Sequence, residues 1–201
     1  MKKGKRELAS DARRTQLMEA AITCFAESGI ARTSMRDIAR KAGVSIGNLY
    51  NHFPGRDDLI AEIARMETQG LTGIVKAVEA CGERKQAVET FVSRYLELCA
   101  EPVSAVLTIE ITSEALRNPA IGGLFSRNRD MLITCLIKAM ALNGPELSRA
   151  EEKRLRQVAG LVTDTIEGFA LRIGLGEKPA SNADKEALMA FIDRAANREG
   201  T

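Results

Sequence analysis

The chain has 201 residues, of which 45% are hydrophobic, 28% charged and 4% aromatic, with only five prolines and no Trp. This is the composition of an ordinary folded protein, and its richness in Ala, Leu, Ile, Glu and Arg favours helices. No stretch approaches the length of a membrane span or a signal peptide, so we expect a cytoplasmic protein with no membrane partner.

Charge is distributed unevenly along the chain. Residues 1–56 hold eleven Lys and Arg against five Asp and Glu, a net charge of +6, which leaves −4 for the remainder. A basic first segment on an acidic body indicates a polyanionic partner for that segment, although composition alone does not exclude a chance distribution of surface charge.

The four cysteines and the single histidine argue against catalysis and metal binding. The cysteines lack C-x-x-C spacing and lie in apolar helical segments, so we expect buried free thiols in a reducing compartment. The only histidine is His52, and no nucleophile with its base, metal cluster or phosphate loop is present. We expect neither an enzyme, nor a cofactor, nor a metal.

Apolar residues recur with helical periodicity almost throughout, and no strand pattern is found. The sequence therefore predicts an all-α fold of about nine helices with short connections. They are expected over 10–28, in two short segments that follow Ser34 and Ser45, and over 56–80, 84–100, 103–117, 120–142, 149–174 and 183–197.

The two short helices have clear boundary signals. Gly29 is expected to cap the first helix in a left-handed conformation, and Ser34 with Asp37 resembles a capping box. Gly43 permits a sharp turn, and Ser45 caps the helix that follows. Two short helices joined by such a turn are the helix-turn-helix pattern, whose second helix enters the DNA major groove.

The residues on and around the second short helix suit DNA contact. Asn48 and Asn51 can read base edges or hold phosphates, and Ile46 can touch a thymine methyl group. Flanking side chains would hold the phosphate backbone. The full predicted DNA-binding set is Thr33, Arg36, Ser45, Ile46, Gly47, Asn48, Tyr50, Asn51, His52 and Arg56.

Gly47 is an unusual choice inside a helix, where glycine costs about 1 kcal/mol relative to alanine. One explanation is close approach of the helix backbone to DNA. The other is clearance between helices inside the protein, and the sequence leaves both open.

The run from Thr33 to Ile60, TSMRDIARKAGVSIGNLYNHFPGRDDLI, resembles the DNA-binding signature of the TetR/AcrR family, and AAITCFAESG before it resembles that family's first helix. Two positions depart from the pattern. Arg56 stands where the family more often has Lys, and Gly55 is a weaker cap than the usual Ser.

The resemblance implies an all-helical homodimer, with a DNA-binding domain over 1–55 and a ligand-binding and dimerisation domain over 56–201. It implies a one-component regulator, most often a repressor, that binds a palindromic operator. A small molecule would release it by moving the recognition helices from the spacing of roughly 34–36 Å that adjacent major grooves require. The alternative is a C-terminal domain that binds a protein partner.

Two apolar stripes on 149–174 indicate a helix buried on both sides, either against its own core and a partner subunit or within a single monomeric core. The second stripe is Leu161, Gly168, Leu171 and Leu175. Together with the 120–142 helix, the first stripe is expected to form the dimer interface through Leu124, Met131, Leu132, Cys135, Leu155, Val158, Val162 and Ile166.

The resemblance also places an effector pocket among the helices between 56 and 175. Candidate lining residues are Met66, Phe91, Tyr95, Cys99, Leu107, Glu110, Ile111, Glu114 and Phe169. Glu110 stands out because it lies on an apolar face, where a carboxylate would favour a cationic or hydroxylated ligand. An exposed or ion-paired glutamate is the alternative. The basic residues Lys2, Lys3, Lys5 and Arg6 are either a solvated tail or a minor-groove contact.

Overall fold

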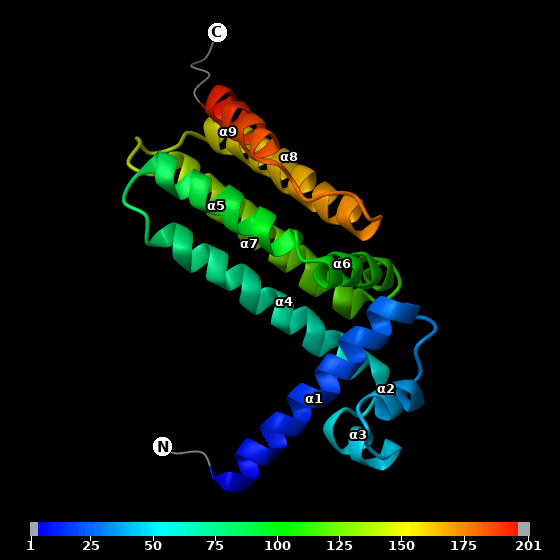
Figure 1. Ribbon diagram of the computed structural model, residues 1–201. Coiled ribbons are helices and arrows are strands. Elements are labelled where there is room, and N and C mark those ends of the chain that lie inside the picture. The colour runs from blue at the N-terminus through cyan, green and yellow to red at the C-terminus, as the bar shows by residue number, and fades with distance from the viewer. Residues whose placement is uncertain (1–3, 197–201) are drawn as a thin grey trace.

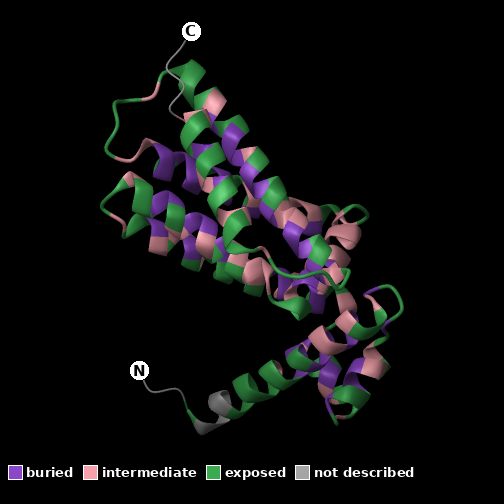
Figure 2. Ribbon diagram, turned by 45° about the horizontal axis from the view of Figure 1, so that its top comes forward, coloured by how far each residue is buried: buried purple, intermediate pink, exposed green. Residues whose placement is uncertain are grey.

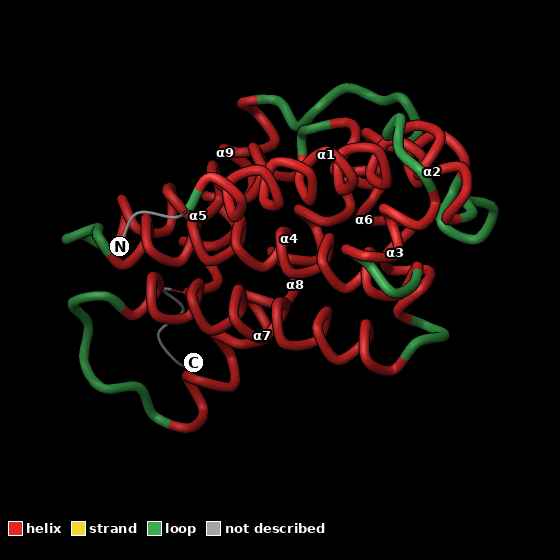
Figure 3. The backbone as a smooth tube through the Cα atoms, turned by 90° about the horizontal axis from the view of Figure 1, so that it is seen from below, coloured by secondary structure: helices red, strands yellow, loops and turns green. Residues whose placement is uncertain are grey.

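The computed structural model describes residues 4–196, with the side chains at 5–8 excepted, and this part of the chain forms nine α-helices and no strand (Figures 1 and 3). The all-α prediction is confirmed. The helices are α1 (Lys5–Ser28), α2 (Met35–Lys41), α3 (Ile46–His52), α4 (Arg56–Glu79), α5 (Arg84–Cys99), α6 (Pro102–Ala115), α7 (Pro119–Ala141), α8 (Arg149–Gly174) and α9 (Asn182–Ala196).

The boundaries agree with the sequence patterns except at the start of α1. That helix begins at Lys5, five residues before the predicted start at Ser10, because the preceding residues contain no helix breaker. Lys2 and Lys3 lie outside the described residues, as do the side chains of Lys5 and Arg6, so the prediction for the basic tail is not tested here.

The predicted caps and turns of the first three helices are confirmed. Ser34 and Asp37 form a reciprocal capping box at the start of α2, and the Ser45 side chain accepts a hydrogen bond from the Asn48 N–H at 3.2 Å. Gly29 and Gly43 have φ angles of 83° and 66°, which residues with a side chain rarely adopt. Local sequence therefore sets the angle between α2 and α3.

The first core lies where α1, α2 and α3 meet the start of α4 (Figure 1). Phe25, Leu49 and Phe53 are almost completely buried there. This core also takes in Leu107 and Ile111 from α6, which packs against α1. The helix-turn-helix is therefore supported from the C-terminal part of the chain.

The second core fills the bundle of α4, α5, α7, α8 and α9, visible as buried segments facing inward in Figure 2. It corrects the predicted dimer interface. Six of the proposed interface residues are buried inside the single chain, because α8 packs its more continuous stripe against α5, α6, α7 and α9: Leu132, Cys135, Leu155, Val158, Val162 and Ile166. Leu124 and Met131 are half-buried.

The second stripe of α8 is the one left open to solvent. Leu161, Leu171 and Leu175 are 56%, 49% and 72% exposed, and Gly168 lies between them with no atom within 4 Å of where its side chain would begin. Of the two apolar stripes, whose periodicity is similar, the first therefore faces the core of this chain.

None of the helices found in residues 4–196 is both long and apolar enough to cross a membrane. All four cysteines are free thiols, as predicted. The predicted burial is found for Cys24 and Cys135, whereas Cys81 and Cys99 are only half-buried.

Candidate functional site

Helix α3 presents one face to solvent and the other to the first core. Leu49 is fully buried, whereas Ile46 and Tyr50 are 37% and 48% exposed, and Ser45, Gly47 and Asn51 are also exposed. An isoleucine and a tyrosine on the open side of a seven-residue helix are an unusual surface, and this surface is free to meet a partner.

Gly47 has no internal reason to be glycine. A Cβ atom built at this position meets no atom within 4 Å, so helix clearance inside the chain does not explain it. Of the two explanations left open by the sequence, close approach by an external partner is the one that remains.

The two asparagines of α3 differ in availability. Asn51 is exposed, whereas Asn48 is half-buried and its Oδ1 atom is enclosed without a hydrogen-bond donor. The carbonyl oxygen of Asn48 therefore cannot reach a partner in this conformation, and Asn51 is the better placed amide for reading a base edge.

Among the flanking residues, Arg36 is fully available to a phosphate. Its side chain is exposed and makes no hydrogen bond or ion pair within the described part of the chain. His52 is half-buried at the end of α3.

Thr33 and Arg56 have internal roles instead. Thr33 is only 4% exposed, and its hydroxyl donates to the carbonyl groups of Cys24 and Gly29 at 3.2 and 2.8 Å. This corrects its assignment as a phosphate contact, because that hydroxyl is already used. Arg56 is half-buried, and its Nη1 donates to the Ile30 carbonyl at 3.2 Å.

Arg14, for which no signal is found in the sequence, attaches α3 to the rest of the chain. Its guanidinium lies over the Phe53 ring at 4.3 Å, donates to the His52 carbonyl at 3.3 Å and forms an ion pair with Glu62 at 2.9 Å. The ion pairs with Arg65 and Arg14 hold the pKa of Glu62 below its usual value. Arg14 therefore holds the end of α3 against α1 and α4.

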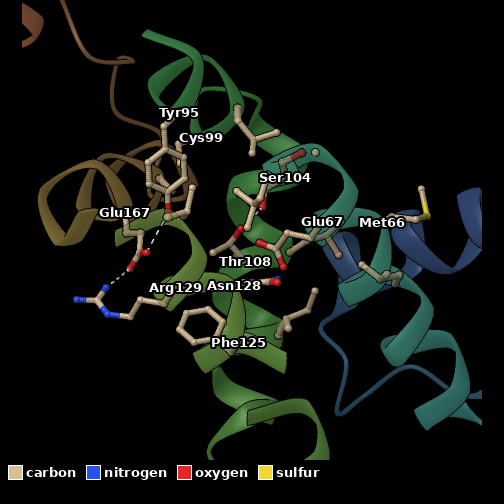
Figure 4. Close-up of a pocket in the computed structure, with 18 of the residues that line it drawn as sticks. Met66, Glu67, Tyr95, Cys99, Ser104, Thr108, Phe125, Asn128, Arg129 and Glu167 are labelled. Carbon is tan, nitrogen blue, oxygen red and sulfur yellow. Dashed lines mark hydrogen bonds and ion pairs between the residues drawn. The ribbon is translucent and has the colours of Figure 1, made fainter. Parts of the chain in front are cut away.

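A cavity of about 260 Å³ lies among the bundle helices, with one wall residue, Ile22, from α1 (Figure 4). Its walls come from α1, α4, α5, α6, α7 and α8 and are mostly apolar. The lining residues are Ile22, Ile63, Met66, Glu67, Gly70, Leu71, Tyr95, Leu98, Cys99, Ser104, Leu107, Thr108, Ile111, Phe125, Asn128, Arg129, Leu132, Glu167 and Ala170.

The predicted pocket residues divide into two groups. Met66, Tyr95, Cys99, Leu107 and Ile111 line the cavity. The others do not. Phe91 is completely buried in the bundle core, Phe169 is buried beside Arg172, and neither Glu114 nor Glu110 reaches the cavity.

Glu110 has a different position from the one predicted. Its Oε2 accepts a hydrogen bond from the Ile30 N–H at 2.8 Å, and both its oxygens lie 3.3 Å from where a Gly29 side chain would begin. The carboxylate therefore binds the end of α1. The Ile30 peptide, held by Glu110 at its N–H and by Arg56 at its carbonyl, joins α6, α1 and α4.

Glu167 forms one polar wall of the cavity. It accepts a hydrogen bond from the Tyr95 hydroxyl at 2.9 Å and a longer one from Arg129 at 3.4 Å (Figure 4). Arg129 pairs more closely with Asp164, at 2.5 Å. Burial raises the pKa of Glu167, and the bonds from Tyr95 and Arg129 oppose that rise. Burial and the Glu167 charge raise the pKa of Tyr95.

Glu67 is the second carboxyl group of the cavity, and no side chain in the described residues gives it an ion pair. Burial raises the pKa of Glu67, the charge of Glu167 raises it further, and the Thr108 hydroxyl opposes the change. Burial and the same two carboxyl groups raise the pKa of Cys99 to about 12, so its thiol stays protonated.

Sequence reasoning missed Glu67, although a signal was present. It lies four residues after Ile63 and four before Leu71, both buried, so it occupies an inward position of α4. The same test singled out Glu110. It also applies to Arg129, which lies four residues after Phe125 and four before Ile133, whereas Glu167 lies four residues after the polar Thr163 and carries a weaker signal.

The fold and the exposed α3 define a helix-turn-helix protein with a hollow helical bundle. The family model for bacterial regulatory proteins of the tetR family matches residues 17–63, which cover α2, α3 and parts of α1 and α4.

Curated relatives agree with this match. The repressor KstR2 of Rhodococcus jostii is 37% identical over 95 residues, 47% of each chain. The regulator UidR of Escherichia coli K12 is 31% identical over 122 residues, 60% of each chain. The aligned part of the chain thus spans about half the length of the curated relatives it matches.

Solved structures extend the similarity of fold to the whole described bundle. A TetR-like transcriptional regulator from Rhodococcus sp. RHA1 has a TM-score of 0.75 at 20% identity, covering 93% of this chain and 97% of that one. Salmonella enterica GusR has a TM-score of 0.73 at 22% identity, covering 92% and 95%. Residues 17–63 thus resemble the DNA-binding segment of tetR-family regulators, and the described bundle shares the fold of these solved structures.

Proposed function

We propose that the chain is a one-component transcription regulator that binds a palindromic operator as a homodimer and leaves it when a small molecule fills the cavity. The observation that carries this proposal is the open face of α3, with Gly47 unobstructed at its start. KstR2 is named a transcriptional repressor, which supports repression as the mode of action.

In this proposal residues 1–55 hold the DNA, and residues 56–201 bind the effector and dimerise. Ile46 and Asn51 contact base edges, and Gly47 lets the helix backbone approach the groove floor. Arg36, Ser45 and Tyr50 hold phosphates with exposed donors, and His52 reaches one from the helix end. Asn48 and Arg56 serve mainly to orient α3 and α4.

The cavity favours a small-molecule effector over a protein partner, because it is a concave, largely apolar site with a few polar groups. Its position also supplies a coupling route. Leu107 and Ile111 of α6 line the cavity and at the same time belong to the core beneath the helix-turn-helix. A ligand that displaces these two side chains therefore disturbs the packing that positions α3.

For the dimer, the exposed stripe of α8 replaces the interface predicted from the sequence. Leu161, Leu171 and Leu175 are exposed apolar side chains along one helix, and Gly168 permits a partner helix to approach closely. Two α3 helices related by the dimer axis would read the two halves of the operator.

The proposal is tested by selecting bound duplexes from a fragment library and measuring affinity for the best duplex by fluorescence anisotropy at several salt concentrations. Arg36→Ala should weaken binding on all sequences and reduce the salt slope by about one unit, since one phosphate contact is lost. Arg94→Ala, which changes an exposed side chain of α5, is the control and should change neither. Affinity that never exceeds the sequence-independent level would refute the proposal.

A further inference from the structure

We infer that the cavity takes an organic cation, a protonated amine on an apolar body, with its nitrogen beside the Glu67 carboxylate. The inference rests on the proposed function only in treating the ligand as an effector. The cavity, its charges and its apolar walls are features of the structure itself.

The charges that line the cavity do not balance. Glu67 and Glu167 are acidic, and Arg129 is the single cationic side chain among the lining residues that the structure describes. Arg129 is already engaged by Asp164 at 2.5 Å and Glu167 at 3.4 Å. Because one guanidinium is shared by two carboxylates, the cluster of Arg129, Asp164 and Glu167 carries one net negative charge. The Glu67 carboxylate adds a second negative charge.

This balance decides among ligand classes. An anionic ligand would need a free cation and would find none in the lining. A neutral ligand would leave the Glu67 carboxyl group without an opposite charge in an apolar site, where an unpaired charge is costly. A protonated amine supplies that charge and donates hydrogen bonds to the carboxylate. Figure 4 shows Glu67 and Glu167 reaching into the same space from α4 and α8.

The remaining walls fit an apolar body. Leu71, Leu98 and Phe125 line the same cavity and offer aliphatic and aromatic surface. The Asn128 amide, whose Oδ1 accepts from Thr68 at 3.0 Å, leaves its NH₂ group for a polar substituent. The space of about 260 Å³ limits the ligand to a compact molecule.

Protonation gives the inference a distinct signature. The titratable groups that face Glu67 are Tyr95 and Cys99 on α5, Arg129 on α7 and Glu167 on α8. In the empty protein, burial and the Glu167 charge raise the pKa of Glu67. An ammonium ion beside it would lower that pKa again, so amine affinity should fall as the pH decreases through the raised value, with protons released on binding.

The experiment compares three compounds that share one body: phenylbutylamine, phenylbutanol and phenylbutyrate. Binding to the full chain is measured by isothermal calorimetry in two buffers of different ionisation enthalpy, up to millimolar ligand concentrations. We expect the amine to bind at least about tenfold more tightly than the other two. Glu67→Gln should remove that preference, whereas Glu146→Gln, on an exposed loop, should preserve it.

Equal binding of the three compounds, tighter binding of the carboxylate, or no binding by any of them overturns the inference. So does an amine preference that survives Glu67→Gln in a variant whose unfolding transition is normal. Failure of the proposed function gives a different result: the amine binds with the expected preference, yet operator affinity does not change when it is added.

Discussion

Replacing Gly47 with alanine should change the stability of the protein and its affinity for DNA in opposite directions. The position is exposed, its φ angle is not in the left-handed region, and a new Cβ atom meets nothing within 4 Å. Alanine is favoured over glycine in a helix by about 1 kcal/mol. The variant should therefore be more stable than the parent by up to about 1 kcal/mol, and its helix-turn-helix should remain intact.

Operator binding should change in the opposite direction. If glycine is present so that the α3 backbone can approach the duplex, a methyl group at Gly47 holds the two surfaces apart and weakens neighbouring contacts. We expect a loss of about tenfold or more in affinity, equivalent to ~1.4 kcal/mol. Urea unfolding measures the first effect, and fluorescence anisotropy on a selected duplex measures the second.

Gly73 supplies the matched control. It is also an exposed helical glycine with no atom within 4 Å of a built Cβ, but it lies in α4, far along the chain from α3. Gly73→Ala should raise stability by a similar amount and preserve operator affinity. If Gly47→Ala stabilises the protein and binds the operator as tightly as the parent, close approach is not the reason for this glycine.

Three further predictions concern stability and assembly. Thr33→Val removes a hydroxyl that donates to two carbonyl groups, so it should lower the free energy of unfolding by about 1–3 kcal/mol. The salt slope of DNA binding should not change, and a reduced slope would restore Thr33 as a phosphate contact. Glu67→Gln removes a carboxyl group whose pKa is raised on folding, which makes the native state bind more protons than the unfolded chain. The stability that this variant gains over the parent should therefore be largest above the raised pKa and should shrink as the pH falls towards 4.5. Urea unfolding at several pH values measures this trend, and Glu146→Gln, at an exposed position, should not show it. Leu161→Glu should convert the proposed dimer to monomer in light-scattering measurements, because it places a charge on the exposed stripe of α8. Leu116→Glu, at an 84% exposed site at the end of α6, should not change the mass. A dimer that persists in Leu161→Glu would place the interface elsewhere.

Local interactions explain why so much of the first three helices could be predicted. A capping box needs only residues 34 and 37, and a left-handed glycine needs only its own φ angle, so Ser34, Asp37, Gly29 and Gly43 behave as their spacing indicates. The open face of α3 follows from the same logic, because burying Leu49 and Phe53 turns Ile46 and Tyr50 outward.

Polar residues on apolar faces could be located from the sequence, but their partners could not. Glu110 and Glu67 both sit among apolar neighbours in helical projection. One binds the Ile30 peptide at the end of α1, and the other enters a cavity beside Glu167, a hundred residues away in the chain. Periodicity predicts that a side chain points inward, but it does not indicate which helix that side chain contacts.

The sequence by itself determined the helix order, the caps and the presentation of α3, because each depends on contacts within a few residues. Tertiary structure alone decided which stripe of α8 is core, how Thr33 and Glu110 are used, and which acids share the cavity. Those outcomes depend on how helices distant in sequence pack together, and an apolar stripe buries equally well against its own chain or against a partner.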